Sequence, residues 1–331
     1  MFAHLPSYLH DRLGAPLVVI PTGQVGVPVF FAISGFVAVL VTHRSPPPTW
    51  QHFLRRRLVR VVPLAWAVMT VKLLTLLVAP GALERASTSP VYIALSYLFL
   101  PGRGADGVVQ PFYTVTWTLA FELLFYVVVT VALAVRVDPF RFASAVFVVL
   151  AAASAFRAPA GWPTWQFHGD RVVLCFLVGM TIGRWAIDRS TRTAVLRLVA
   201  ITALWTVVGT IAEASTGALM LLPIAAVALA LTVASEPFIG RRVGLVGTTL
   251  GDASYALYLT HPIVAPTTVA VIAAVASGSS APVLVGAAAV GAAVAASVVV
   301  WFAVDRPVIR LLQGGRGGLD RRGRGRRRAP G

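Results

Sequence analysis

Apolar runs long enough to cross a lipid bilayer recur along the whole chain, and they constrain its fold more than any other feature. A helix needs about 20 mostly apolar residues to cross a hydrocarbon core of roughly 30 Å. Backbone groups inside lipid must be satisfied within the segment, which favours helices. Only 12% of the 331 residues are charged, whereas soluble domains average about a quarter. The sequence therefore predicts an all-α fold, a polytopic transmembrane helix bundle.

The expected spans number nine, and short connections separate most of them. They lie near residues 24–42, 58–80, 119–135, 142–157, 171–187, 195–213, 216–234, 253–276 and 282–304. A further stretch, residues 91–101, is too short to cross alone, so we expect it to be half-inserted or interfacial. This pattern predicts a transmembrane domain over residues 1–312 and a disordered, arginine-rich tail over residues 313–331.

Basic residues are distributed unevenly along the chain. With nine spans, 22 of the 28 lysines and arginines fall on one side of the membrane, in loops and in the tail. Cytoplasmic loops carry an excess of basic residues, so we expect a cytoplasmic C-terminus and a multi-pass protein of the cell inner (plasma) membrane. No aromatic residues are interleaved with the arginines of the tail. We therefore expect it to attract anionic lipid headgroups and not nucleic acid.

Polar side chains inside spans are costly, so each is a candidate functional residue. The first group lies in GVPVFFAISGFVAVL (26–40) and HFLRRRLVRVVP (52–63). Ser34 sits among small residues, and Arg57 and Arg60 share one helical face because they are three positions apart. Planar guanidinium groups suit phosphate oxygens. The alternatives are simple helix packing for Ser34 and topology-setting charge for the arginines.

The second group lies in TWTLAFELLFYVV (116–128). Glu122 falls a few residues into the span, with Trp117 at its outer boundary and Tyr126 one turn later. A carboxyl group near hydrocarbon needs a cation or hydrogen-bond donors to hold it. We expect Glu122 to orient a histidine or a substrate hydroxyl, or to act as an acid. A structural hydrogen bond to a neighbouring helix is the alternative.

The third group lies in LGDASYALYLTHPIV (250–264). Ser254, Tyr258 and His261 fall on one stripe of a helix, and Pro262 removes a backbone donor beside the histidine. We expect this stripe to line a cavity, with a packing histidine as the alternative. On the expected span boundaries, Glu122 lies toward the outer face and His261 toward the cytoplasmic third.

Two single residues stand apart from these groups. Lys72, the only lysine, lies near the outer end of its span, where it can reach the interface by snorkelling. Cys175, the only cysteine, lies in an apolar run. One cysteine excludes a disulfide framework and a cysteine metal site, and we expect no metal.

These groups, in this order, resemble the motifs of the acyltransferase type 3 family. GVPVFFAISGF is similar to the family's GVxxFFxxSGF segment, and RRRLVRVVP to its arginine pair with a following proline. TWTLAFELLFY and LGDASYALYLTHPIV resemble its W-S-L-x-x-E-x-x-F-Y and L-G-x-x-S-Y-x-L-Y-L-x-H-P patterns. WFAVDRPVIRLL looks like its closing E-x-P segment, with Asp305 for the usual glutamate.

The resemblance implies an integral membrane O-acyltransferase. Such an enzyme moves an acyl group, most often acetyl, from acyl-CoA as co-substrate to a hydroxyl of a carbohydrate or glycosylated acceptor, with no permanently bound cofactor. It implies His4 as the general base and Glu122 as the residue that orients the base or the hydroxyl. Arg57 and Arg60 would bind the CoA phosphates. The residues implied to line the cavity are Ser34, Trp117, Tyr126, Ser254, Tyr258 and His261.

The family fold has ten spans with both termini in the cytoplasm, whereas we expect nine here, with the N-terminus as written outside. The absent span is the first, and MFAH resembles the end of that helix. We therefore expect translation to begin upstream of the recorded start. Two alternatives are an inactive, truncated homologue and a membrane transporter or carrier that performs no chemistry.

Overall fold

The structure, a computed structural model, describes residues 5–13, 24–78, 89–158, 161–239, 243–275 and 281–314. Within these ranges every regular element is a helix, apart from one isolated β-bridge between Arg103 and Val109. The all-α prediction is confirmed. His4 and nearly all of the arginine-rich tail lie outside the described residues.

The helices follow one another through most of the chain. Their bounds are α1 (Leu5–Leu13), α2 (Gly26–Thr42), α3 (Trp50–Val78), α4 (Pro90–Tyr97), α5 (Trp117–Ala134), α6 (Pro139–Ser154), α7 (Leu174–Asp188), α8 (Thr191–Ile211), α9 (Thr216–Ile239), α10 (Leu245–Val275), α11 (Pro282–Val300) and α12 (Arg306–Gly314). A π-helical turn, η7 (Trp301–Asp305), joins α11 to α12, and short 3₁₀ turns precede α5 and α7.

Six helical segments of the described chain are long and apolar enough, by length and composition, to cross a membrane. They cover residues 50–78, 114–134, 191–211, 216–238, 245–275 and 282–313. Helices α2 and α6 are apolar but shorter, and α7 has 15 residues. A multi-pass membrane protein is therefore supported, whereas the expected count of nine spans is not confirmed. The short stretch at residues 91–101 overlaps only the eight-residue α4.

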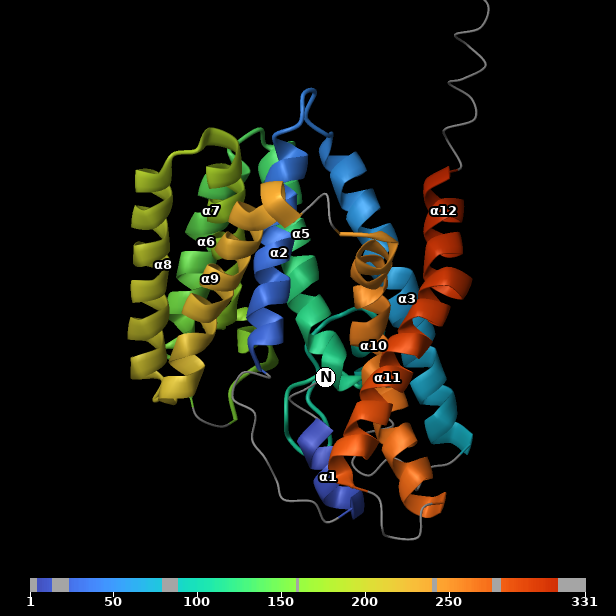
Figure 1. Cartoon of the computed structure of the whole chain (residues 1–331). Coiled ribbons are helices and arrows are strands. Elements are labelled where there is room, and N and C mark those ends of the chain that lie inside the picture. Colours follow the sequence, from blue (N-terminus) through green and yellow to red (C-terminus); the bar gives the residue numbers. More distant parts are fainter. Residues whose placement is uncertain are drawn as a thin grey trace, which may run out of the picture.

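The helices form two groups that meet along α2, α3 and α5 (Figure 1). On one side, α7 packs against α2, α6, α8 and α9. On the other, α10 packs most extensively against α11 and also contacts α1 and α3, while α12 lies against α3. Helix α5 contacts α2, α3 and α6 and so joins the two groups.

Glycines bring α2 and α7 into backbone contact. A Cβ placed on Gly179 of α7 would lie 1.7 Å from the carbonyl oxygen of Ala32. A Cβ on Gly35 of α2 would lie 2.1 Å from the carbonyl oxygen of Phe176. Small residues permit this close approach between membrane helices. The contact fixes the position of α2 and hence of its Ser34.

The segment before α5 folds into the bundle. The Phe112 amide donates to Ser96 Oγ at 2.8 Å, and its carbonyl accepts from Lys72 Nζ at 3.1 Å. The hydroxyl of the buried Tyr113 donates to the carbonyl of Leu259, in α10, at 2.5 Å. Helix α5 therefore begins inside the bundle, not at its surface. Lys72 binds this segment of the chain, whereas the sequence predicted that it snorkels toward the interface.

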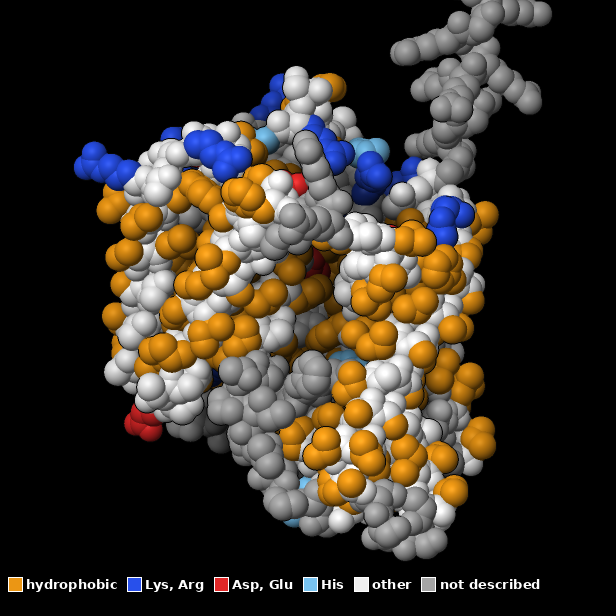
Figure 2. All heavy atoms as spheres, in the orientation of Figure 1, with side chains coloured by type: hydrophobic (Ala, Val, Ile, Leu, Met, Phe, Trp, Pro, Cys, Tyr) orange, Lys and Arg blue, Asp and Glu red, His pale blue; other side chains and the backbone are white. Residues whose placement is uncertain are grey.

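Hydrophobic side chains cover the flanks of the molecule, and basic side chains gather at one end (Figure 2). That end carries the connection between α2 and α3 and the C-terminal part of α12 (Figure 1). The view also shows a recess between α9 and the pair α10–α11, with acidic side-chain atoms inside it (Figure 2). We refer to the end that carries the basic side chains as the basic end.

Candidate active site

Glu122 lies at the centre of a hydrogen-bonded group that joins α2 and α5. Its side chain is buried, with 1% exposed. Glu122 Oε1 accepts hydrogen bonds from Ser34 Oγ, at 2.7 Å, and from the hydroxyl of Tyr126. Glu122 Oε2 has no hydrogen-bond partner within the part of the chain that the structure describes. Three of the expected site residues are thus brought together, and one buried oxygen of the carboxyl group is left to accept from, or donate to, a ligand.

A pocket of about 560 Å³ opens at the basic end, between the start of α3 and the C-terminal half of α2. We call it the arginine pocket. Its walls include apolar residues of α2 and the prolines that follow it. Its polar lining consists of Arg44, His52, Arg56, Arg57, Arg60 and Gln313. Four permanently charged guanidinium groups make this pocket suited to a ligand that carries phosphate groups.

Arg57 connects the arginine pocket to the Glu122 group. Its guanidinium carbon lies 5.4 Å from the ring centre of Phe53 and 5.7 Å from that of Tyr126. Tyr126 in turn donates to Glu122. Only the Tyr126 side chain therefore separates Arg57, at the inner end of the pocket, from the buried carboxyl group of Glu122.

Arg60 is held by groups from two other helical segments. Its guanidinium lies 3.4 Å from Asp305 Oδ2 and 3.3 Å from the carbonyl oxygen of Asp252. It also lies 5.9 Å from the ring centre of Tyr255. Asp305 is buried and belongs to the π-helical turn between α11 and α12, a local geometry that is frequent at functional sites.

His261 lies farther from the arginine pocket than Glu122 does. Its Nδ1 is 2.8 Å from the carbonyl oxygen of Tyr258. Because a carbonyl only accepts, Nδ1 of the neutral ring carries the hydrogen and Nε2 carries the lone pair. The Tyr258 hydroxyl donates to the Val115 carbonyl at 2.7 Å and lies 2.8 Å from Thr118 Oγ1. The contact between Thr118 of α5 and Tyr258 of α10 therefore lies next to Glu122, one turn away along α5.

The expected depths of Glu122 and His261 are reversed. Helices α5 and α10 run in opposite directions (Figure 1), and Tyr255 of α10 lies against Arg60. Moving away from the basic end, Tyr126, Glu122 and Thr118 follow one another on α5. On α10 the corresponding order is Tyr255, then Tyr258, then His261. The expectation was wrong because α5 begins inside the bundle, which places Glu122 on the arginine side.

The other expected site residues lie elsewhere. Ser254 is exposed, and its hydroxyl donates to the Gly251 carbonyl of its own helix at 2.7 Å, so it does not share the site of Tyr258 and His261. Trp117 packs edge-on against the rings of Phe31 and Phe121. Trp117 therefore contributes to the aromatic core beside Ser34 and Glu122.

Sequence reasoning left Asp305 out of the site. The residue was matched to a family motif, but its role as the partner of Arg60 was not foreseen. The available signal was an acidic residue directly after an apolar span, on the same side of the membrane as the arginines. In the described ranges, no cluster of three or more histidine, cysteine, aspartate or glutamate side chains could hold a metal ion.

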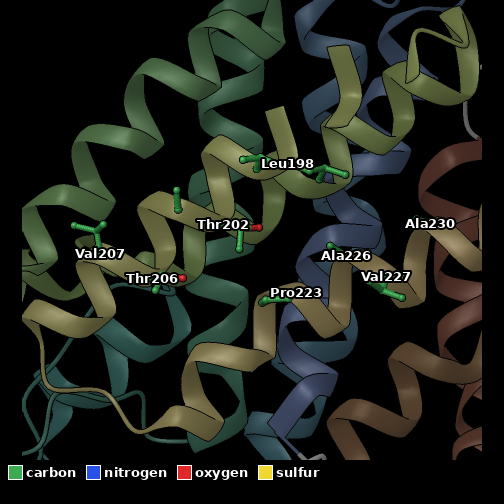
Figure 3. A pocket seen from close by; sticks show the side chains of 10 residues that line it. Leu198, Thr202, Thr206, Val207, Pro223, Ala226, Val227 and Ala230 are labelled. Atoms are coloured by element: carbon green, nitrogen blue, oxygen red, sulfur yellow. The ribbon is translucent and has the colours of Figure 1, made fainter. Parts of the chain in front are cut away.

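A second pocket of the described chain has a different chemistry. It has a volume of about 640 Å³ and lies between α8 and α9 (Figure 3). Its lining is apolar except for the hydroxyl groups of Thr202 and Thr206. Without an ionisable group it offers no acid, base or anion-binding side chain, so the candidate site is the arginine pocket together with the Glu122 group.

Comparison with known proteins identifies the family of this chain. The profile of an acyltransferase domain matches residues 1–302. The chain is 31% identical over 304 residues to the exopolysaccharide production protein ExoZ of Rhizobium meliloti (strain 1021), which covers 87% of this chain and 90% of that protein. No solved structure matches significantly. The chain belongs to the acyltransferase type 3 family of membrane proteins.

Proposed function

We propose that this protein transfers an acyl group, most simply acetyl, from acyl-CoA to a hydroxyl group of a carbohydrate acceptor at the membrane. The observation that carries the proposal is the arginine pocket, whose Arg57 lies against the tyrosine that donates to Glu122. Membership of the acyltransferase family and the similarity to ExoZ, an exopolysaccharide production protein, support it.

The arginine pocket is the proposed site of the donor. Coenzyme A carries three phosphate groups, and guanidinium groups bind phosphate oxygens in bidentate geometry. Arg57 and Arg60 would bind these phosphates, with Arg44 and Arg56 contributing charge at the rim. With the phosphates there, the thioester at the far end of the pantetheine arm would point toward Glu122.

The proposed reaction needs a base, because a neutral hydroxyl attacks a thioester poorly. The hydroxyl oxygen bonds to the thioester carbonyl carbon while the base takes the hydroxyl proton, and the carbon–sulfur bond then breaks to release CoA as its thiolate. A positioned histidine contributes roughly 10² to 10⁴ in rate. We assign His4 as that base from the sequence, with Glu122 orienting it or the acceptor hydroxyl. The proposed transfer is direct, without an acyl-enzyme intermediate.

The proposed topology follows from charge. The basic end faces the cytoplasm of a bacterial cell, where acyl-CoA is made, and the C-terminus lies on the same side. The described helices are assigned to nine spans, with α2, α6 and α7 crossing together with the six longer segments. The acceptor then approaches from the opposite end of the bundle.

Isotope tracing tests the function directly. The full chain, reconstituted in nanodiscs, is incubated with [1-¹⁴C]acetyl-CoA and exopolysaccharide from the host. An acyltransferase moves the label into an alkali-labile ester on the polysaccharide and releases one CoA for each label moved. A carrier would leave the thioester intact, and an inactive homologue would bind CoA without turnover. Either result refutes the proposal.

A further inference from the structure

Two connections between α-helices meet at the end of the bundle opposite the arginine pocket. Residues 98–116 precede α5, and residues 155–173 connect α6 to α7. Arg103 links them, because its guanidinium donates to the Gly107 carbonyl at 2.7 Å and to the carbonyl of Trp162. We call the part of these two segments that carries Arg103, Arg157, Trp162, Trp165 and Asp170 the Trp165 platform; contacts join the first three of these residues and Asp170, and Trp165 follows Trp162 in the same connection.

The polar part of this platform is held in place but still open to solvent. Arg157 Nη2 lies 3.1 Å from Asp170 Oδ2, and the Arg157 guanidinium lies 4.8 Å from the ring centre of Trp162. The other Asp170 oxygen accepts from the Val172 amide at 2.9 Å. The side chains of Arg157 and Asp170 keep 25% and 35% of their surface exposed. A fixed donor group and a fixed acceptor group are therefore presented side by side.

The aromatic part of the platform is Trp165, whose side chain is 73% exposed. It belongs to the 3₁₀ turn η4 (Thr164–His168). Two residues later, the buried Phe167 packs against Phe121 of α5 with ring centres 5.1 Å apart. The turn is thus anchored on the helix that carries Glu122, while the indole ring projects outward.

Pyranose rings match this combination of groups. A sugar ring presents apolar C–H faces, which an exposed indole face can cover, and a rim of hydroxyl groups that both donate and accept hydrogen bonds. Arg157 offers donors to those hydroxyl groups, and Asp170 offers acceptors. A tryptophan that serves only as an interfacial membrane anchor has no need of the fixed Arg157–Asp170 pair.

We propose that the Trp165 platform is the binding site for the carbohydrate acceptor. This inference rests on the proposed function and adds where the acceptor is held. Donor and acceptor would then enter from opposite ends of the bundle, since the arginine pocket occupies the basic end.

Binding without the donor tests the platform. The full chain in nanodiscs is titrated with tetrasaccharides of glucose, galactose and glucuronic acid, and binding is measured by tryptophan fluorescence and by calorimetry. We expect saturable binding of at least one of them. The variants Trp165→Ala and Asp170→Asn should weaken it at least about tenfold, which matches the effect of truncating a binding hot spot. Trp50→Ala is the matched control, because Trp50 is 42% exposed at the start of α3, at the basic end.

The outcomes separate this inference from the proposed function. If none of the three tetrasaccharides binds, or if Trp165→Ala binds as tightly as the unsubstituted chain, the platform is not an acceptor site. If Trp165→Ala binds sugar normally but is retained less well in the bilayer, Trp165 is a membrane anchor, and this result also overturns the inference. Sugar binding without label transfer from acetyl-CoA would refute the proposed function and leave the platform as a carbohydrate site. Label transfer with unchanged acceptor KM in Trp165→Ala would refute the platform alone.

Discussion

The contact between α2 and α7 predicts that one methyl group, added to a residue outside the site, will damage the site. In Gly179→Ala, the new Cβ would lie 1.7 Å from the Ala32 carbonyl oxygen, whereas ordinary contacts begin at 3.4 Å. The obstacle is backbone, which cannot rotate away. The two helices must therefore move apart by about 1.7 Å, since packed interiors have no free space to absorb the group.

Two consequences of this shift have magnitudes that can be estimated. Overpacking of a well-packed core costs about 1–3 kcal/mol, and a clash with backbone belongs at the upper end of that range. Ser34 Oγ lies only 2.7 Å from Glu122 Oε1, so a shift of this size in either direction breaks their hydrogen bond. A hydrogen bond to a charged group contributes about 1.5–3 kcal/mol. The loss would reduce turnover about ten- to a hundredfold if it is realised in the transition state.

The assay compares melting temperature and acetyl transfer of the purified full chain in nanodiscs. Gly291→Ala is the control, because a Cβ at Gly291 of α11 meets nothing within 4 Å. The control should keep its turnover and gain up to about 1 kcal/mol from helix propensity. If Gly179→Ala melts and turns over like the control, the close packing of α2 on α7 does not position the site.

Further substitutions test the charges. Asp305→Asn removes the carboxylate 3.4 Å from Arg60. Because Arg60 is partly exposed, we expect donor binding to weaken by about 1–2 kcal/mol, which raises the donor KM about 5- to 30-fold. Asp305→Glu should restore the donor KM. Arg57→Ala should raise the donor KM and flatten its dependence on salt concentration, and an unchanged salt slope would contradict the phosphate assignment. Asp138→Ala removes the N-cap of α6 and its 2.9 Å ion pair with Arg184. It should lower the free energy of unfolding by about 1 kcal/mol, measured as a fall in melting temperature. Partial burial alone would raise the pKa of Asp138, but the amide of residue 141 and the Arg184 guanidinium lower it below its usual value. The ionised Asp138 therefore contributes fully to stability above about pH 4, and this contribution is lost as the pH falls through the lowered pKa. The melting temperature of Asp138→Asn should not show this fall at acid pH.

Local pattern predicted those parts of the site that lie on a single helix. Glu122 and Tyr126 were expected together because residues four apart share a helix face, and they are hydrogen-bonded. Arg57 and Arg60 were expected on one face for the same reason, and both line the arginine pocket. The connection of Glu122 to Ser34 spans 88 residues and depends on how α2 packs on its neighbours, which spacing along the chain does not encode.

The errors have physical causes. The depths of Glu122 and His261 were reversed because span boundaries were read from hydropathy, which does not show that residues 98–116 fold into the bundle. Ser254 was expected in the cavity because it shares a stripe with Tyr258. It lies toward the end of α10 where residues 250–252 are also exposed. Asp305 was missed because it lies in a π-helical turn, where the regular helical spacing of side chains is interrupted. The periodicity of the sequence does not predict such a turn.

The central claim is that acyl transfer takes place where the arginine pocket reaches Glu122. The most direct measurement compares the full chain with its Glu122→Gln variant, using single-turnover transfer of [1-¹⁴C]acetyl from acetyl-CoA and equilibrium binding of CoA. Glutamine keeps the size of the side chain and an oxygen for Ser34 and Tyr126 but removes the acid. We expect CoA to bind within about twofold of the unsubstituted chain and transfer to slow at least about a hundredfold. Transfer at an undiminished rate in the variant would contradict the claim.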